Sequence, residues 1–363
     1  MVKTQDIFCL IMAGGSGTRF WPRSKNTQPK QFINIFGDET LLELTVKRFK
    51  NITAPENIYI VSNKQQAGIL EKQDTGLSLG NLIYEPVGKN TLPCIGLAAL
   101  FAEKENPESV MVVSPADHLI RNNSIFNDTI LSAVNLAQKK DGIVTIGIPP
   151  DYAAPGYGYV QTEDLVGEEN NTRQFKVKQF VEKPDEKTAA QYLESGNYYW
   201  NSGLFVFKVS VFLEAINKFA PALYTDLKKI QEKIGQPEFD QTLDKIYREV
   251  ESISVDYGIM EHADNIYLVE GNFDWNDLGS WESVYLASED KDENGNVQSG
   301  ENILMNTKNS YVHSDDSLIA LVGMEDVVVV QDKNTILVCN REDAEDVKKI
   351  VNKLKGENKQ EFL

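Results

Sequence analysis

The chain has 363 residues, of which 54 are acidic and 36 are basic, so its formal net charge is −18 at pH 7. A chain of this length is typical of one large α/β domain joined to a smaller one. Such an acidic surface repels nucleic-acid phosphates and anionic membranes, which argues against both as partners. A small anionic ligand stays possible where positive charge is concentrated at one site.

The cysteines and histidines indicate neither a disulfide framework nor a zinc site. Cys9, Cys94 and Cys339 are an odd number and lie far apart, and the sequence has no CxxC or HxxxH spacing. No apolar run approaches the ~18 residues of a membrane span, and the first residues carry no export-signal pattern. We therefore expect a cytoplasmic protein with reduced thiols.

Short apolar runs alternate with helical patterns through the first half of the chain. Thr40 and Glu43 form a capping box, in which a hydroxyl and a carboxylate satisfy the free backbone amides at a helix start. This alternation predicts a parallel sheet with helices on both faces. For the chain as a whole we expect a Rossmann-like, mixed, mainly parallel sheet. The predicted strands are 7–13, 57–62, 81–84, 109–114 and 142–148, and the predicted helices are 40–49, 92–103 and 124–137.

The pattern changes after residue 152, where a Gly-Tyr-Gly-Tyr segment leads into an extended strand. The polar stretch 288–300 is punctuated by glycine and is the best candidate for a linker. We predict a large domain over 1–287, a linker over 288–300, and a small β-rich C-terminal domain over 301–363 that ends in a helix. The predicted strands are 174–182, 198–207, 265–270, 302–305, 317–322, 327–330 and 335–339, and the predicted helices include 185–193, 280–287 and 342–354.

The segment LIMAGGSGTRFWPRSKNTQPKQF places cations beside a glycine turn in an otherwise acidic chain. Gly14, Gly15 and Gly17 let a phosphate approach the backbone at the carboxyl edge of the sheet. Arg19 and Lys30 would then supply charge to phosphate oxygens. A tight turn followed by a solvated basic loop is the alternative, because the segment matches neither GxGxxG nor GxxxxGK[ST].

Several motifs in order along the chain resolve this choice. GGSGTRFWP and PKQF are followed by SPADH at 114–118, FVEKP at 180–184, WNSG at 200–203, SVDYGIME at 254–261 and FDWNDLGSW at 273–281. Together they resemble the signature of the sugar-phosphate nucleotidyltransferases, and more narrowly that of the mannose-1-phosphate guanylyltransferases. The segment 327–351 is similar to the short C-terminal region of that family, so the resemblance covers nearly the whole chain.

The resemblance implies an enzyme that transfers GMP from GTP to α-D-mannose 1-phosphate and yields GDP-mannose and pyrophosphate. The sugar phosphate would attack the α-phosphorus in line, so no serine or cysteine nucleophile is needed. In this family pattern Asp117 and Asp277 hold Mg²⁺, Arg19 stabilises the leaving pyrophosphate, and Lys30 lies near the α- and β-phosphates. The family also suggests a homodimer formed through the C-terminal region.

The resemblance assigns the remaining site residues to two ligands. Asp256 matches a family motif without an assigned role, and His118 is expected to hold its loop because a phosphate monoester needs no general base. The four tryptophans are expected to pack under the loops. The residues implied for the nucleotide are Gly14, Gly15, Gly17, Thr18, Glu85, Asn90 and Thr91, and those implied for the sugar phosphate are Gly156, Gly158, Glu182, Lys183 and Asn201.

Three alternatives stay open. A relative that uses another sugar 1-phosphate or another base has the same motifs, and a non-catalytic regulatory homologue would bind GDP-mannose without turning substrate over. A nicotinamide dehydrogenase is disfavoured because the third glycine of its fingerprint is absent. Without the resemblance, Asp117 is as readily interpreted as a helix cap or turn acid as a metal ligand. Asp277 and Asn201 would then be interpreted as turn residues.

Overall fold

The computed structural model describes residues 6–15 and 17–363, and the chain forms two compact units. The first unit comprises Met1–Gly14, Thr45–Ala116 and Ile120–Trp275. The second unit comprises Gly15–Leu44, Asp117–Leu119 and Asn276–Leu363. Each unit is therefore built from segments that are distant in sequence.

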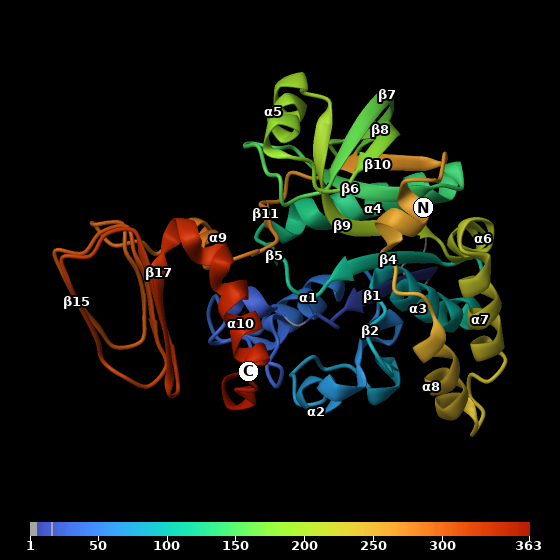
Figure 1. Ribbon diagram of the computed structural model, residues 1–363. Coiled ribbons are helices and arrows are strands. Elements are labelled where there is room, and N and C mark those ends of the chain that lie inside the picture. The colour runs from blue at the N-terminus through green and yellow to red at the C-terminus, as the bar shows by residue number, and fades with distance from the viewer. Residues whose placement is uncertain (1–5, 16) are drawn as a thin grey trace. The chain divides into compact units, whose positions relative to one another are not determined.

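The first unit is built on one nine-stranded sheet in the order β3-β2-β1-β4-β9-β6-β10-β8-β7 (Figure 1). All of its strands run in the same direction except β8 and β9, which pair antiparallel with their neighbours. The predicted mixed, mainly parallel sheet is thus confirmed. The strands are β1 (Ile7–Met12), β2 (Ile58–Asn63), β3 (Leu82–Glu85), β4 (Val110–Pro115), β6 (Ile143–Ile148), β7 (Tyr159–Glu169), β8 (Thr172–Val181), β9 (Tyr198–Lys208) and β10 (Ile266–Glu270).

The sheet is buried on both faces, as β1 illustrates. Phe8 and Leu10 belong to the same apolar cluster as helix α3. Because successive side chains of a strand point to opposite faces, the fully buried Ile7, Cys9 and Ile11 face the other side. The helices are α1 (Leu41–Phe49), α2 (Ala67–Leu70), α3 (Thr91–Glu105), α4 (Asn123–Lys140), α5 (Glu186–Ser195), α6 (Val209–Phe219), α7 (Pro221–Gln231) and α8 (Phe239–Glu249).

The second unit contains stacked short strands next to two helices (Figure 1). The strands β12, β14 and β16 pair in parallel, β17 extends this sheet antiparallel, and β13 and β15 form a second parallel sheet. Alternate strands therefore stack on one another, as the coils of a β-helix do. The bounds are α9 (Trp281–Ala287), β12 (Val297–Ser299), β13 (Asn302–Met305), β14 (Tyr311–Ser314), β15 (Ile319–Val322), β16 (Val327–Asp332), β17 (Thr335–Asn340) and α10 (Val347–Gly356).

Some predicted elements differ from the observed ones. The helix predicted over 342–354 starts as a 3₁₀ turn over Arg341–Asp346, and α10 follows it. Strand β14 has no counterpart among the predicted elements, and β12 lies within the stretch 288–300. Both are short strands whose stability comes from neighbours in the stack, so their own sequences carry little signal. The remaining short strands, β5 (Leu119–Ile120) and β11 (Trp275–Asn276), pair with each other.

Two further predictions concern local structure. The capping box exists, because the Thr40 amide donates to the Glu43 carboxylate at 2.8 Å and the Glu43 amide donates to the Thr40 hydroxyl at 3.2 Å. In the part of the chain that the structure describes, no helix combines the length and the apolar character that crossing a bilayer requires.

Candidate active site

A buried aromatic pair anchors the turn that follows the glycine segment. Phe20 and Trp21 are buried, whereas the preceding Arg19 is exposed. The Phe20 ring lies 5.0 Å from the ring of Trp281, and the Trp281 indole donates a hydrogen bond of 3.1 Å to the Trp21 carbonyl. The Trp21 indole in turn donates to the Phe362 carbonyl at 2.8 Å. The aromatic residues of the motif therefore pack into the core and leave Arg19 on its surface.

The glycine turn requires glycine at one position in particular. Gly17 has a φ of +55°, and a Cβ there would lie 2.4 Å from the Cβ of Lys30 and 2.9 Å from its backbone nitrogen. Any side chain would thus collide with the Lys30 backbone. Gly17 brings the turn directly onto Lys30, although the two are distant along the loop. The neighbouring Ser16 lies outside the described residues.

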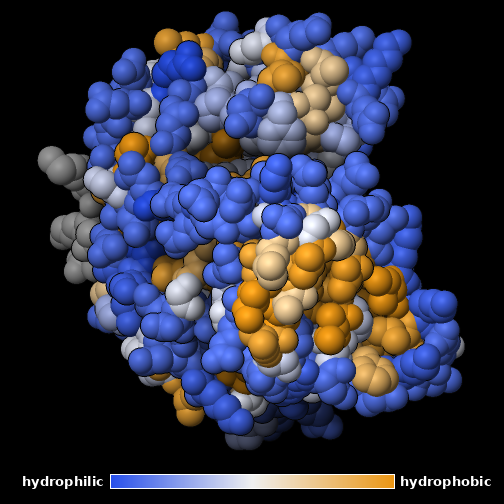
Figure 2. Space-filling model, turned by 90° about the vertical axis from the view of Figure 1, so that its left-hand side faces the viewer, coloured by the Kyte–Doolittle hydropathy of each residue, from blue (hydrophilic) through white to orange (hydrophobic). Residues whose placement is uncertain are grey.

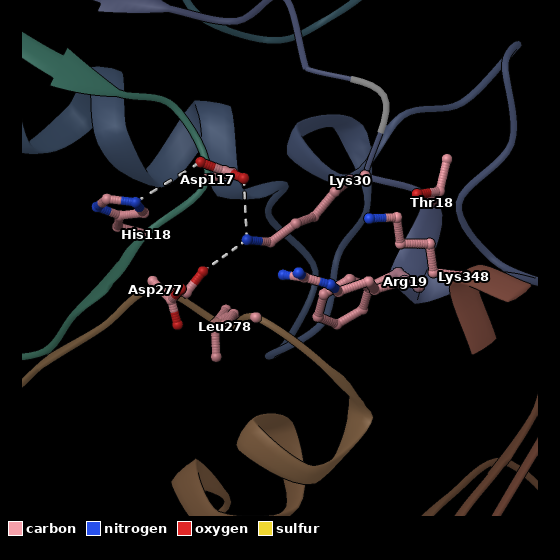
Figure 3. A pocket seen from close by; sticks show the side chains of 11 residues that line it. Thr18, Arg19, Lys30, Asp117, His118, Asp277, Leu278 and Lys348 are labelled. Atoms are coloured by element: carbon pink, nitrogen blue, oxygen red, sulfur yellow. Dashed lines mark hydrogen bonds and ion pairs between the residues drawn. The ribbon is translucent and has the colours of Figure 1, made fainter. Parts of the chain in front are cut away.

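Lys30 is the centre of a polar cluster. Its side chain is only 7% exposed, and its ammonium nitrogen lies 2.9 Å from Asp117 Oδ2. The same nitrogen donates a hydrogen bond of 2.6 Å to the backbone carbonyl of Asp277. Figure 3 shows Lys30 reaching between the two aspartates, which come from different segments of the chain. The structure thus brings three predicted catalytic residues together within the second unit.

The charges in this cluster favour an ionised Asp117. Burial acts to raise the pKa of Asp117, but the Lys30 ammonium, His118 and hydrogen bonds to the carboxylate outweigh it and lower that pKa. His118 Nε2 lies 4.0 Å from Asp117 Oδ1. Asp117 is therefore a carboxylate at neutral pH, which is the form that binds cations. That His118 holds its loop stays a prediction.

A pocket of about 300 Å³ opens over this cluster. Arg19 and Thr18 line one side, and Asp117, His118 and Asp277 line another. Lys348 from α10 also lines the pocket, and sequence reasoning missed it (Figure 3). Its sequence context is a Lys-Lys pair in an amphipathic helix, which is ordinary for a solvated face. No pattern in the sequence distinguishes it.

The donor set in this pocket fits Mg²⁺. Asp117 and Asp277 offer carboxylate oxygens, the ligands that this ion prefers. A Cβ on Gly279 would lie 3.3 Å from Asp277 Oδ2 and 3.4 Å from Oδ1, so the glycine keeps the surroundings of that carboxylate open. The described residues contain no group of three or more His, Cys, Asp or Glu side chains placed as a metal site. Further ligands would have to come from phosphate oxygens and water, as is usual for Mg²⁺.

A second cluster of predicted residues lies in the first unit, around Glu182. Glu182 pairs with Lys183 at 3.0 Å, and a Cβ on Gly158 would lie 2.5 Å from Glu182 Oε2. Asn201 donates its backbone amide to the Gly158 carbonyl at 2.8 Å and its side-chain amide to Asp256 at 3.1 Å. These residues therefore form one polar cluster. Gly156 is exposed, and a Cβ there would meet no atom within 4 Å.

The nucleotide residues predicted after strand β3 also belong to the first unit. Burial raises the pKa of Glu85 to about 7, although the hydrogen bond donated by Tyr247 opposes the shift. Glu85 lies beside Gly14, where a Cβ would be 3.6 Å from its Oε2. Asn90 caps α3 by accepting from the Thr91 amide at 2.9 Å. Gly14, Glu85, Asn90 and Thr91 thus lie in the first unit, whereas Gly15, Gly17 and Thr18 lie in the second.

The pKa of Asp256, which belongs to the Glu182 cluster, is raised above its ordinary value. Burial, followed by the charge of Glu182, raises its pKa to about 6. A carboxyl group whose pKa is higher in the folded state favours folding at low pH, and this contribution is lost as the pH rises through the folded value. At neutral pH the ionised Asp256 is therefore a cost to stability, as is common in functional sites.

We expect Asp256→Asn to raise the melting temperature at pH 7 to 8, because the amide has no charge to bury. The gain should shrink as the pH falls from 6 towards 4, where the native carboxyl is protonated. Thermal unfolding of both proteins across this pH range checks the prediction. Asp164→Asn is the control, because Asp164 is exposed on β7. An equal gain at pH 4 and pH 8 would contradict the electrostatic explanation.

Comparison with known proteins gives matches over nearly the whole chain. Residues 8–294 match the family described as nucleotidyl transferase, and residues 300–354 match a MannoseP isomerase/GMP-like beta-helix domain. Mannose-1-phosphate guanylyltransferase 2 of Escherichia coli O157:H7 is 37% identical over 365 residues, which cover 98% of this chain and 75% of that protein. Mannose-1-phosphate guanylyltransferase of Klebsiella pneumoniae is 39% identical over 359 residues, which cover 97% and 75%.

A solved structure is also similar over almost the whole chain. The crystal structure of mannose-1-phosphate geranyltransferase from Thermus thermophilus has a TM-score of 0.86 and 28% sequence identity, and the match covers 97% of this chain and 100% of that chain. The family match, the curated relatives and the fold agree with one another. The chain belongs to the nucleotidyl transferase family, among the mannose-1-phosphate guanylyltransferases.

Proposed function

We propose that this protein transfers GMP from GTP to α-D-mannose 1-phosphate and releases GDP-mannose and pyrophosphate. One observation carries the proposal: the ammonium of Lys30 is held between Asp117 and the Asp277 carbonyl, in a pocket that Gly17 and Arg19 also line. A buried cation beside the Asp117 carboxylate and a glycine turn, in a pocket that Asp277 also lines, suits a polyphosphate with a divalent ion. The relatives named above support the choice of sugar and base.

In the proposed reaction a phosphate oxygen of the sugar phosphate attacks the α-phosphorus of GTP. One P–O bond forms, the bond from the α-phosphorus to the bridging oxygen breaks, and its electron pair leaves with pyrophosphate. No proton has to move in this step, because a phosphate monoester is already ionised at neutral pH. Catalysis then depends on positioning and on neutralising charge.

The second unit would supply most of the charge. Lys30 would neutralise the α-phosphate, and Arg19 would bind the oxygens of the leaving pyrophosphate. Asp117 and Asp277 would hold Mg²⁺, which when bound supplies positive charge to the phosphate oxygens and orients them. The peptide amides of Gly15 and Gly17 and the hydroxyl of Thr18 would add hydrogen bonds to the same oxygens.

The first unit would supply recognition of the sugar and the base. Glu182 and Asn201 would offer a carboxylate and an amide to adjacent hydroxyls, and Lys183 would offer a cation to the sugar phosphate. Gly156 and Gly158 would let backbone atoms approach the sugar. Glu85, Asn90 and Thr91 would contact the guanosine. A carboxylate such as that of Glu85 accepts hydrogen bonds from the two adjacent donors on the edge of guanine.

The experiment that tests the proposal is a grid of substrates. The purified protein is incubated with Mg²⁺ and each pair of GTP, ATP, UTP or dTTP with mannose, glucose or heptose 1-phosphate, and pyrophosphate release is measured. We expect turnover with GTP and mannose 1-phosphate above all other pairs. Preference for another pair would assign a different substrate, and binding of GDP-mannose without any turnover would favour a regulatory role.

We further propose that the catalytic domain spans 1–287, with a linker over 288–300 and a β-rich domain over 301–363. The family matches to residues 8–294 and 300–354 support this division. We also propose that the protein acts in the cytoplasm. The thiols of Cys9, Cys94 and Cys339 are all free, which suits a reducing compartment.

The stacked strands of the second unit support a homodimer. Figure 2 shows hydrophobic side chains gathered on the face of the molecule where these strands lie. They belong to strands β13, β15 and β17, and their side chains are more than half exposed. Apolar patches of this kind mark interaction surfaces, and the hydrophobic effect favours covering them with a second copy. The exposed residues are Ile303, Met305, Val322, Ile336 and Val338.

We expect the double substitution Val322→Glu and Ile336→Lys to convert a dimer into a monomer, because each change buries a charge at the interface. The two side chains are 66% and 64% exposed, so the monomer should still fold. Analytical ultracentrifugation at micromolar concentration checks the mass. Leu79→Glu, at a position in the first unit that is 70% exposed, is the control and should leave the dimer intact. A native protein that sediments as a monomer would contradict the dimer.

A further inference from the structure

Helix α10 carries a lysine into the phosphate pocket. Val347 and Val351 are buried and pack in the same apolar core as Phe20 and Trp21. Because residues four apart lie on one face of a helix, these two valines fix the rotation of α10 about its axis. Lys348 then points from the flank of the helix into the pocket, beside Thr18 and Arg19 (Figure 3). The packing of Val347 and Val351 in the core therefore determines where Lys348 lies.

The charges that line the pocket leave Lys348 available for a ligand. Lys30 is already engaged by Asp117 and by the Asp277 carbonyl. Among the residues that the structure describes, neither Arg19 nor Lys348 takes part in an ion pair. Two cations therefore lie together without a carboxylate between them. Both side chains are exposed to solvent, and two cations that line one pocket suit an anionic ligand with several phosphate oxygens.

The adjacent Lys349 lies outside the pocket and serves as an internal comparison for Lys348. Lys349 follows Lys348 in the same helix, but its ammonium pairs with Asp346 at 2.6 Å and its side chain is 76% exposed. It does not line the pocket. The two lysines have the same charge and are neighbours near the start of the helix. They differ in the direction of their side chains, because only that of Lys348 reaches the pocket.

We propose that Lys348 is a third phosphate-binding cation, which together with Arg19 holds the two terminal phosphates of the nucleotide and the pyrophosphate that leaves. The inference rests on the proposed function and adds to it a residue from the predicted β-rich domain. Arg19 and Lys348 lie on the side of the pocket away from Asp117 (Figure 3). The reacting α-phosphate would then lie near Lys30, and the departing group near Arg19 and Lys348. The C-terminal helix would in this way contribute directly to the active site.

The test compares Lys348→Ala, Lys348→Arg and Lys349→Ala with the native protein in the reverse reaction, from GDP-mannose and pyrophosphate with Mg²⁺. We expect Lys348→Ala to raise the KM for pyrophosphate about tenfold, because one charge-assisted hydrogen bond is lost. The KM for GDP-mannose should stay unchanged, Lys348→Arg should recover most of the loss, and Lys349→Ala should behave like the native protein. Melting temperatures show that each variant is folded.

Two results would overturn the inference. One is a KM for pyrophosphate in Lys348→Ala that stays within twofold of the native value, and the other is an equal rise in Lys349→Ala. If the native protein turns over no substrate, the proposed function fails on its own. The same variants are then titrated with Mg²⁺ and pyrophosphate in a calorimeter. Weaker binding in Lys348→Ala alone would still support the role of Lys348, and equal binding or none would contradict it.

Discussion

Lys30→Met should lower turnover by about 10²–10³-fold, which is the usual effect of removing one preorganised charge from an active site. Methionine keeps the apolar stem of the side chain and removes only the ammonium, which lies over the Phe20 ring at 5.4 Å from its centroid. The loss should appear in kcat, because Lys30 would act on the charge that develops at the reacting phosphate. Steady-state rates with GTP and mannose 1-phosphate measure it.

The same substitution should lower stability in a way that depends on pH. Removing the ammonium costs about 1–3 kcal/mol in the free energy of unfolding, because Asp117 and the Asp277 carbonyl lose their partner. Lys30 contributes to the lowered pKa of Asp117, so this stabilisation is present above the ordinary value of 3.8 and is lost as the pH falls through the folded value. Native and variant stabilities should converge in acid.

Lys25→Met is the matched control for Lys30→Met. Lys25 lies in the same loop, its side chain is 16% exposed, and its ammonium pairs with Asp332 at 2.5 Å. It does not line the pocket, so its removal should cost stability but not turnover. Turnover in Lys30→Met equal to that in Lys25→Met would show that the phosphate site has been placed wrongly.

The second large effect is expected for Asp117→Asn. The amide keeps the shape of the side chain but loses the negative charge that Mg²⁺ requires, so turnover should fall by about 10²–10³-fold. The concentration of Mg²⁺ that gives half of the maximal rate should rise as well. Titration of the rate with MgCl₂ at saturating GTP separates this effect from a general loss of folding.

Asp332→Asn is the corresponding control, because Asp332 is the carboxylate partner of Lys25 and lies outside the pocket. The double variant Lys30→Met with Asp117→Asn completes the comparison. Two residues that act on the same phosphate group should give a combined loss smaller than the product of the single losses. An unchanged Mg²⁺ requirement in Asp117→Asn would mean that Asp117 does not hold the ion.

Local sequence patterns were sufficient for most elements of the first unit. Strand β1 is a continuous apolar run because both faces of the sheet are covered, and α4 shows the helical period with Asn122 as its cap. The reversal of β9 within the sheet had no such signal. The period of two residues is the same in either direction along a strand, so the partners alone decide it.

The sequence likewise predicted part of the candidate site, whereas other parts became evident only in the structure. The sequence alone suggested Gly17, Arg19 and Lys30, because glycine turns and cations near a strand end have recognisable local chemistry, whereas Asp117 needed the family resemblance. It also supplied the family motifs, which pointed to Asp277 far along the chain. It did not indicate that the backbone carbonyl of Asp277 would accept a hydrogen bond from Lys30.

Composition, periodicity and motif order therefore predicted the fold class, most of the elements and the family of this protein, since each is encoded within a few residues or in a family pattern. Only the tertiary structure decided which side chains meet. The stacking of β12, β14 and β16, the assignment of the predicted site residues to two units, and the direction of Lys348 all depend on contacts between distant segments. Val347 and Val351 mark the apolar face of α10 in the sequence, but the core on which that face packs, and so the pocket that Lys348 reaches, is built from distant segments.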